Sequence, residues 1–384
     1  MLRLILGRAG SGKTTQVLQR LCRGGPDKRQ ILMVPEQQSH EAERALCRFG
    51  GDSVSLYAEV LSFSRLSNRV FLAAGGMGEP ELDAGGRILM MHRAVRSVAS
   101  QLTVYARPSR RPAFLEELLS TVDELKSCCV RPELLLQAGE EAGAGEGDKL
   151  HDLGLICTAY EALSARTALD PRDRLTRTAE KLRDCPWAQG ADLWLDGFTD
   201  FTPQQQEVLR ELLKQADTVT VTLTCDHLEE DEGGAGIFSP ARRTAAQLLR
   251  LAKQERIQSE VEILDGHDPA KAPELQIVER QLFAQERPEP VSCGGAVELF
   301  QASTPRAEVE RTAARIRELV RKEGYRYRDM GVVARDFSAY QPLVESVFPR
   351  YEIPVFSSAM TDILEKPILT LVTAALDTVA NGYR

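Results

Sequence analysis

A single run near the N-terminus decides the fold of this chain: Leu2-Arg3-Leu4-Ile5-Leu6-Gly7-Arg8-Ala9-Gly10-Ser11-Gly12-Lys13-Thr14. Its apolar first part predicts a β-strand. Its second part fits the phosphate-loop pattern G-x-x-x-x-G-K-[ST], directly before a predicted helix at residues 13–21. Glycines let the backbone curl so that several N–H groups point at one anion, and the helix adds its positive end. This order predicts a nucleoside triphosphate site, with a chance match in a glycine-bearing turn as the alternative.

The candidate nucleotide ligands in this loop are six residues: Gly7, Gly10, Ser11, Gly12, Lys13 and Thr14. Lys13 supplies a positive charge for the β- and γ-phosphates, and the Thr14 hydroxyl can hold Mg²⁺. We therefore expect ATP and Mg²⁺ as the cofactors of the site. A loop of this kind binds a nucleotide without revealing what the binding is for.

The bulk composition describes an ordinary globular protein. The 384 residues suggest two or three domains, and 43% hydrophobic with 27% charged residues allow a large core. No apolar run approaches the roughly 20 residues that cross a bilayer, and no signal peptide is visible, so we expect a cytoplasmic protein with no membrane partner. None of the eight cysteines has metal-ligand spacing, so we expect no metal cluster.

One stretch could contact nucleic acid, although the net charge of −8 provides no general attraction to it. Residues 84–115 contain no Asp or Glu, and they carry six arginines: Arg87, Arg93, Arg96, Arg107, Arg110 and Arg111. Such arginines can neutralise a phosphate backbone. A solvated helix face followed by a Pro-rich loop explains the same composition equally well, so both interpretations stay open.

Strand and helix patterns alternate in the first part of the chain. Strands are predicted at residues 3–6, 31–34 and 53–56, and helices at residues 13–21, 37–48 and 60–73. Further strands are predicted at residues 191–196, 218–224 and 261–264. Alternation of this kind predicts βαβ units and a parallel sheet.

The middle and the end of the chain differ from this pattern. Residues 84–185 show helical periodicity alone, which predicts a helical insertion into a sheet domain of residues 1–83 and 186–290. Residues 291–384 follow a Pro- and Gly-rich linker. There, predicted strands at residues 297–301, 331–334 and 353–356 alternate with helices. These elements predict a second, incomplete α/β domain, and we expect the chain to be a fragment of a longer protein.

A phosphate loop needs an acid on a nearby strand end to position Mg²⁺. Asp196 is the candidate, because it ends the apolar run of residues 191–195. The predicted metal residues are therefore Thr14 and Asp196. The alternative is an Asp that only caps the turn after its strand.

The residues around Asp196 resemble motif II of the UvrD-like helicases of superfamily 1. Asp196, Asp200 and Gln204 are kept, but Gly197 stands where that family has a glutamate. In the family this glutamate activates the attacking water, and loss of a general base typically costs on the order of 10²- to 10⁴-fold in rate. The resemblance therefore implies a site that holds ATP–Mg²⁺ and hydrolyses it weakly or not at all, although Glu36 or Asp200 could substitute as the base.

Other segments extend this resemblance. Residues 34–37 and 61–66 lie where the helicases have their single-strand DNA motifs, so the implied DNA contacts are Ser62, Phe63, Ser64 and Arg65. Phe63 would offer a stacking face for a base, and plain core packing is its alternative role. Residues 331–335 resemble motif IV, in which Arg335 matches the arginine that reaches the γ-phosphate and Ala334 replaces a tyrosine.

The ordered set of GRAGSGKT, VPEQ, LSFSRL and LDGF-x-x-F-T-P-x-Q resembles the AddB family over the whole chain. Members of that family belong to the bacterial AddAB helicase–nucleases. The resemblance implies a RecA-like domain 1A, an inserted domain 1B and the beginning of a second RecA-like domain, 2A. It implies DNA, either single strands or double-strand ends, and an AddA-type subunit as heterodimer partner. The implied role is DNA end resection with Chi recognition, in repair of double-strand breaks by homologous recombination.

The family's nuclease domain and iron–sulfur cluster lie further C-terminal, and neither is expected here. Two other classes stay open. One is a stand-alone phosphate-loop ATPase or nucleotide kinase, and the other is a structural module whose phosphate loop is a relic.

Overall fold

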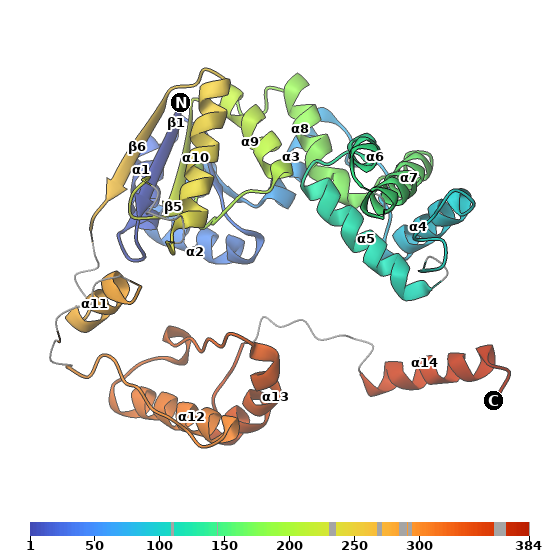
Figure 1. The fold of residues 1–384 in the computed structure, drawn as a ribbon. Coiled ribbons are helices and arrows are strands. Elements are labelled where there is room, and N and C mark those ends of the chain that lie inside the picture. The colour runs from blue at the N-terminus through green and yellow to red at the C-terminus, as the bar shows by residue number, and fades with distance from the viewer. Residues whose placement is uncertain are drawn as a thin grey trace. The chain divides into compact units, whose positions relative to one another are not determined.

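The computed structural model describes residues 1–108, 111–143, 145–229, 236–266, 271–283, 290, 294–356 and 366–383. The chain divides into two compact units, Met1–Glu289 and Pro290–Arg384. The first unit contains a six-stranded, all-parallel sheet (Figure 1). Helices cover both of its faces, as parallel strands require. This arrangement confirms the predicted α/β, RecA-like fold class.

The sheet has the strand order β3-β2-β4-β5-β1-β6. Its strands are β1 (Leu2–Gly7), β2 (Gln30–Met33), β3 (Ala58–Leu61), β4 (Asp192–Leu195), β5 (Thr218–Thr224) and β6 (Ser259–Leu264). The prediction of a strand at residues 53–56 was wrong, because these residues form the short 3-10 helix η2 (Asp52–Leu56) and the strand follows it. In residues 58–61 the register pairs Ala58 with Gln30 and Leu61 with Met33.

The two faces of the sheet have separate cores. On one face, Ile5 and Trp194 pack with Val17 and Leu46, from α1 (Lys13–Gly24) and α2 (Ser39–Gly50). The opposite face buries Leu4 and Leu6 of β1, because successive side chains of a strand point to opposite sides. The helices there are α3 (Phe63–Ala74), α8 (Arg174–Asp184), α9 (Pro203–Gln215) and α10 (Ser239–Gln254). A further helix, α11 (Pro273–Gln281), follows β6.

The predicted insertion forms a helical layer with its own core, which includes Met91, Leu118, Ile156 and Tyr160. Its helices are α4 (Ala84–Val98), α5 (Pro112–Ser127), α6 (Pro132–Glu141) and α7 (Glu146–Ser164). Figure 1 shows α3, α8 and α9 between this layer and the sheet. By packing, α8 belongs with the sheet, since Ala179 and Leu182 join the core beneath it, whereas the sequence placed residues up to 185 in the insertion.

The second unit is built around two helices in its described residues. They are α12 (Pro305–Lys322) and α13 (Phe337–Val347), accompanied by the short 3-10 helices η5 (Tyr327–Asp329) and η6 (Phe348–Tyr351) and followed by α14 (Pro367–Ala380). Val309, Val347 and Ile353 lie in their common core. The strands predicted at residues 297–301, 331–334 and 353–356 are not formed. A strand needs a hydrogen-bonded neighbour, and the described part of this unit supplies none.

Candidate nucleotide-binding site

The glycine loop of residues 7–14 connects the end of β1 to the start of α1. Gly10 and Gly12 have φ values of 78° and 89°, in the left-handed region that glycine adopts without strain. At Gly7 the reason is close packing, because a Cβ atom would collide with the Ser11 Oγ atom. The loop can therefore curl tightly at the carboxyl edge of the sheet, where α/β proteins bind ligands.

Lys13 folds over this loop. Its Nζ atom donates hydrogen bonds to the carbonyl oxygens of Gly7, at 2.7 Å, and Arg8, at 2.9 Å. Burial lowers the pKa of Lys13, while the charges of Asp196 and Glu279 oppose that shift. The Ser11 Oγ atom is buried and has no hydrogen-bond partner among the described residues. The loop thus concentrates a cation and a buried hydroxyl in one small space.

Asp196, just past the end of β4, meets the loop directly. Thr14 Oγ1 donates to Asp196 Oδ2 at 2.7 Å, although the two residues are 182 positions apart. Thr222 Oγ1, from β5, donates to Asp196 Oδ1 at 2.5 Å. The structure therefore brings both predicted metal residues together. Magnesium in nucleotide sites takes one or two protein oxygens, the phosphates and water, and this hydroxyl–carboxylate pair fits such a donor set.

A second acid, Asp226, supports the loop from outside and was not predicted as a site residue. Its Oδ2 atom accepts from Arg8 Nη2 at 2.9 Å, and its Oδ1 atom accepts from Arg242 Nη2 at 2.8 Å. Burial opposes ionisation, but Arg242 and Arg8 outweigh it, so the pKa of Asp226 lies below its ordinary value. Arg242 is only 4% exposed. The place of Asp226 just after β5, beside the loop in space, was the available signal.

Around Gly197 a cavity of about 600 Å³ gathers segments that follow β2, β3 and β4. The lining residues include Pro35, Glu36, Ser64, Arg172, Gly197 and Asp200. Two of the sequence segments that resemble helicase motifs, residues 34–37 and 61–66, thus meet the residues after Asp196 at one edge of the sheet. Arg172 and Arg174 were not predicted here, and they enter from the segment that leads into α8.

The four predicted DNA contacts of residues 62–65 have different environments. Ser62 is buried and caps α3, accepting from the Arg65 N–H at 3.3 Å. Phe63 is buried, and its ring lies edge-on to Phe198 with centroids 5.7 Å apart. These two predictions are therefore corrected, because a buried cap and a buried ring offer no face to a nucleic acid. Ser64 and Arg65 are exposed.

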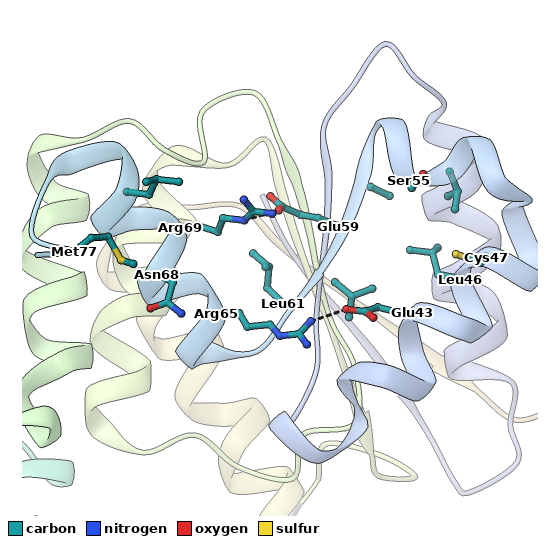
Figure 2. Close-up of a pocket in the computed structure, with 14 residues that line it drawn as sticks. Glu43, Leu46, Cys47, Ser55, Glu59, Leu61, Arg65, Asn68, Arg69 and Met77 are labelled. Atoms are coloured by element: carbon teal, nitrogen blue, oxygen red, sulfur yellow. Dashed lines mark hydrogen bonds and ion pairs between the residues drawn. The ribbon is translucent and has the colours of Figure 1, made fainter. Parts of the chain in front are cut away.

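Arg65 lies at the open side of the sheet, beside the edge strand β3. Figure 2 shows its side chain pointing to Glu43 across a groove between α2 and α3, and the two form an ion pair of 2.5 Å. The groove encloses about 510 Å³, and Leu61 and Glu59 contribute to its wall. A DNA phosphate would therefore compete with Glu43 for Arg65.

The six arginines of residues 84–115 also separate. Arg87 is 9% exposed, and its guanidinium forms ion pairs with Asp123 and with Asp170, the latter at 3.1 Å. The prediction that Arg87 contacts DNA is corrected, since its charge is already neutralised inside the insertion. Four members are exposed: Arg93, Arg96, Arg107 and Arg111. Arg110 lies outside the described residues.

Arg335 belongs to the second unit, and its contact with the γ-phosphate stays a prediction. Among the described residues, no cluster of three or more His, Cys, Asp and Glu side chains is placed to hold a metal ion. The same residues contain no helix that is long and apolar enough to span a membrane.

Comparisons with known proteins agree with this architecture. Residues 4–279 match the family model described as ADDB, N-terminal. Similar over the chain are proteins whose name makes them the B subunit of an ATP-dependent helicase/deoxyribonuclease. That of Pelotomaculum thermopropionicum is 35% identical, with 100% of this chain and 34% of the relative covered. That of Acetivibrio thermocellus is 34% identical, with 98% and 34% covered. The chain spans about a third of the length of these curated relatives, and it belongs to the AddB family.

Proposed function

We propose that the first unit holds ATP–Mg²⁺ in the glycine loop and serves as a helicase-like, DNA-binding part of a helicase–nuclease. The hydrogen bond between Thr14 and Asp196 carries the nucleotide half of this proposal. It joins the start of the loop helix to an acid from a distant strand, and a bound triphosphate–magnesium complex needs both groups. The residues that bind the nucleotide are Gly7, Gly10, Ser11, Gly12, Lys13, Thr14, Asp196 and, from the second unit, Arg335.

The loop residues have separate tasks in this proposal. Backbone N–H groups of the loop surround the phosphates, and the Lys13 ammonium exchanges its two carbonyl partners for phosphate oxygens. Magnesium, when bound, neutralises charge on the β- and γ-phosphates. Thr14 and Asp196 supply its protein oxygens, and Thr222 keeps the Asp196 carboxylate turned toward the loop.

The DNA half of the proposal rests on exposed groups. Arg93, Arg96, Arg107 and Arg111 provide charge on the insertion, and Ser64 and Arg65 provide contacts near the cavity beside Gly197. Relatives named as parts of a helicase/deoxyribonuclease support a DNA substrate and a partner subunit. We infer that the partner is an AddA-type subunit. We also infer that the complex resects DNA ends and recognises Chi during repair of double-strand breaks.

A titration of the intact chain with a fluorescent ATP analogue and Mg²⁺ tests the nucleotide half. Lys13→Ala should weaken binding at least about 100-fold, or about 2.7 kcal/mol, because the loop loses its cation. Lys149→Ala removes an exposed lysine of α7 and should leave binding unchanged.

An unchanged affinity in Lys13→Ala would contradict the proposal and favour a relic loop. Steady ATP turnover without DNA or a partner would favour the stand-alone ATPase or kinase instead.

A further inference from the structure

The residue after Asp196 is Gly197, and its backbone excludes most side chains. Its φ is 81°, a conformation that costs other residues roughly 1–2 kcal/mol. A Cβ atom there would also collide with the side-chain oxygen of Gln38 and would lie 3.4 Å from Pro35 Cδ. The space beside the magnesium acid is therefore occupied by an amide from another segment.

Gln38 reaches this place from the 3-10 helix η1 (Glu36–Gln38), which follows β2. The turn is fixed by a hydrogen bond of 2.9 Å from the Gln38 N–H to the Pro35 carbonyl. Gln38 is exposed and lies immediately before α2. A substitution at its side chain can therefore change the chemistry next to Gly197 without disturbing a core.

Hydrolysis of a bound triphosphate requires a group that accepts a proton from water. A carboxylate takes that proton while the water oxygen bonds to the γ-phosphorus, and the bond to the β-phosphate oxygen breaks with its electron pair leaving on ADP. A neutral amide cannot accept the proton. Asp196 is committed to Thr14 and Thr222, and Glu36 and Asp200 line the adjoining cavity from exposed positions.

We propose that Gln38 occupies the place of the general base and so makes this site hold its nucleotide without hydrolysing it. This inference rests on the proposed nucleotide binding, and it adds a named residue that sets the outcome. A carboxylate at position 38 would stand beside the magnesium acid and could take the proton from the attacking water.

The test is a gain of function. Gln38→Glu should raise the steady ATP turnover of the intact chain at least about 10-fold over the wild type, a modest share of what a general base supplies. Gln38→Ala should show no such gain, and the double variant Lys13→Ala/Gln38→Glu should lose it. Analogue binding and thermal unfolding of each variant show whether the site and the fold are retained.

The outcomes separate the two proposals. If Gln38→Glu binds nucleotide normally and turnover does not rise, the role of Gln38 is overturned while nucleotide binding stands. If the wild type already turns over and Gln38→Ala slows it, Gln38 orients the water instead, which also overturns the inference. Turnover that disappears in Glu36→Gln or Asp200→Asn would overturn it too. A wild type that does not bind nucleotide would overturn both proposals.

Discussion

The glycine loop of residues 7–14 and the arginine-rich stretch of residues 84–115 both carry charges that suit phosphate, but the fold uses them differently. In the loop, the strand–loop–helix connection points Lys13 and Thr14 into one space, and Asp196 arrives from β4. In the stretch, one helix turns Arg87 into the core of the insertion and Arg93 to solvent. A spacing motif fixes where its groups converge, whereas a composition bias leaves each side chain's direction to packing.

The sharpest way to break this comparison lies within α4 itself. Arg87→Ala should lower the free energy of unfolding of the first unit by about 3 kcal/mol, the low end for breaking a buried ion pair. The buried Asp170 then loses one of its two cationic partners and keeps only Lys126. Arg93→Ala, on the same helix, should change the free energy of unfolding by less than about 0.5 kcal/mol.

Urea unfolding followed by tryptophan fluorescence measures both variants. It reports the first unit, since Trp187 and Trp194 are the two tryptophans of the chain. Equal effects of the two substitutions would mean that Arg87 is not a structural residue.

A smaller effect is expected where an acid supports the loop. Asp226→Asn removes the charge that holds Arg8 and the buried Arg242, and it should cost about 1.5–3 kcal/mol of stability. Because Arg8 belongs to the glycine loop, nucleotide affinity should fall by about 10-fold as well, or about 1.4 kcal/mol. Calorimetric titration of the variant with an ATP analogue checks this. Full affinity would show that the loop keeps its shape without Asp226.

The same acid predicts how stability depends on pH. The pKa of Asp226 is lowered in the folded chain, so its contribution is present above the unfolded value of about 3.9 and is lost as pH falls through the folded value. The stability difference between wild type and Asp226→Asn should therefore shrink below about pH 4. Urea midpoints measured at a series of pH values on both sides of that point test this. A constant difference would show that the carboxylate's charge is not what the arginines require.

The exposed arginines should give the smallest effect in free energy per residue. Changing Arg93, Arg96, Arg107 and Arg111 together to Gln should weaken single-strand DNA binding. It should also lower the dependence of log K on log salt by as much as about 3, if all four contact phosphates. Fluorescence anisotropy at several salt concentrations measures both quantities. An unchanged slope would assign these arginines to an ordinary solvated surface, which the sequence left open.

Much of the first unit could be predicted from the sequence. The run at residues 2–14 predicted the strand, the loop and the helix, because each has a local physical signature: an apolar run, glycine freedom and a lysine at a fixed distance. Asp196 was found by the same logic, as an acid at the end of a buried strand. The strand expected at residues 53–56 failed since pairing with β2 selects Ala58–Leu61, and pairing is not a local property.

What the sequence determined by itself is therefore the set of groups carried by short, self-consistent segments: the glycine loop, the parallel strands and Asp196. Only the tertiary structure decided that Arg87 pairs with Asp170, that Phe63 packs on Phe198, that Asp226 holds Arg8 and that Gln38 covers Gly197. It also decided that residues 331–334 form no strand. The physical reason is that burial, ion pairing and strand pairing depend on partners far away in the chain, and a residue's own neighbours in sequence do not name them.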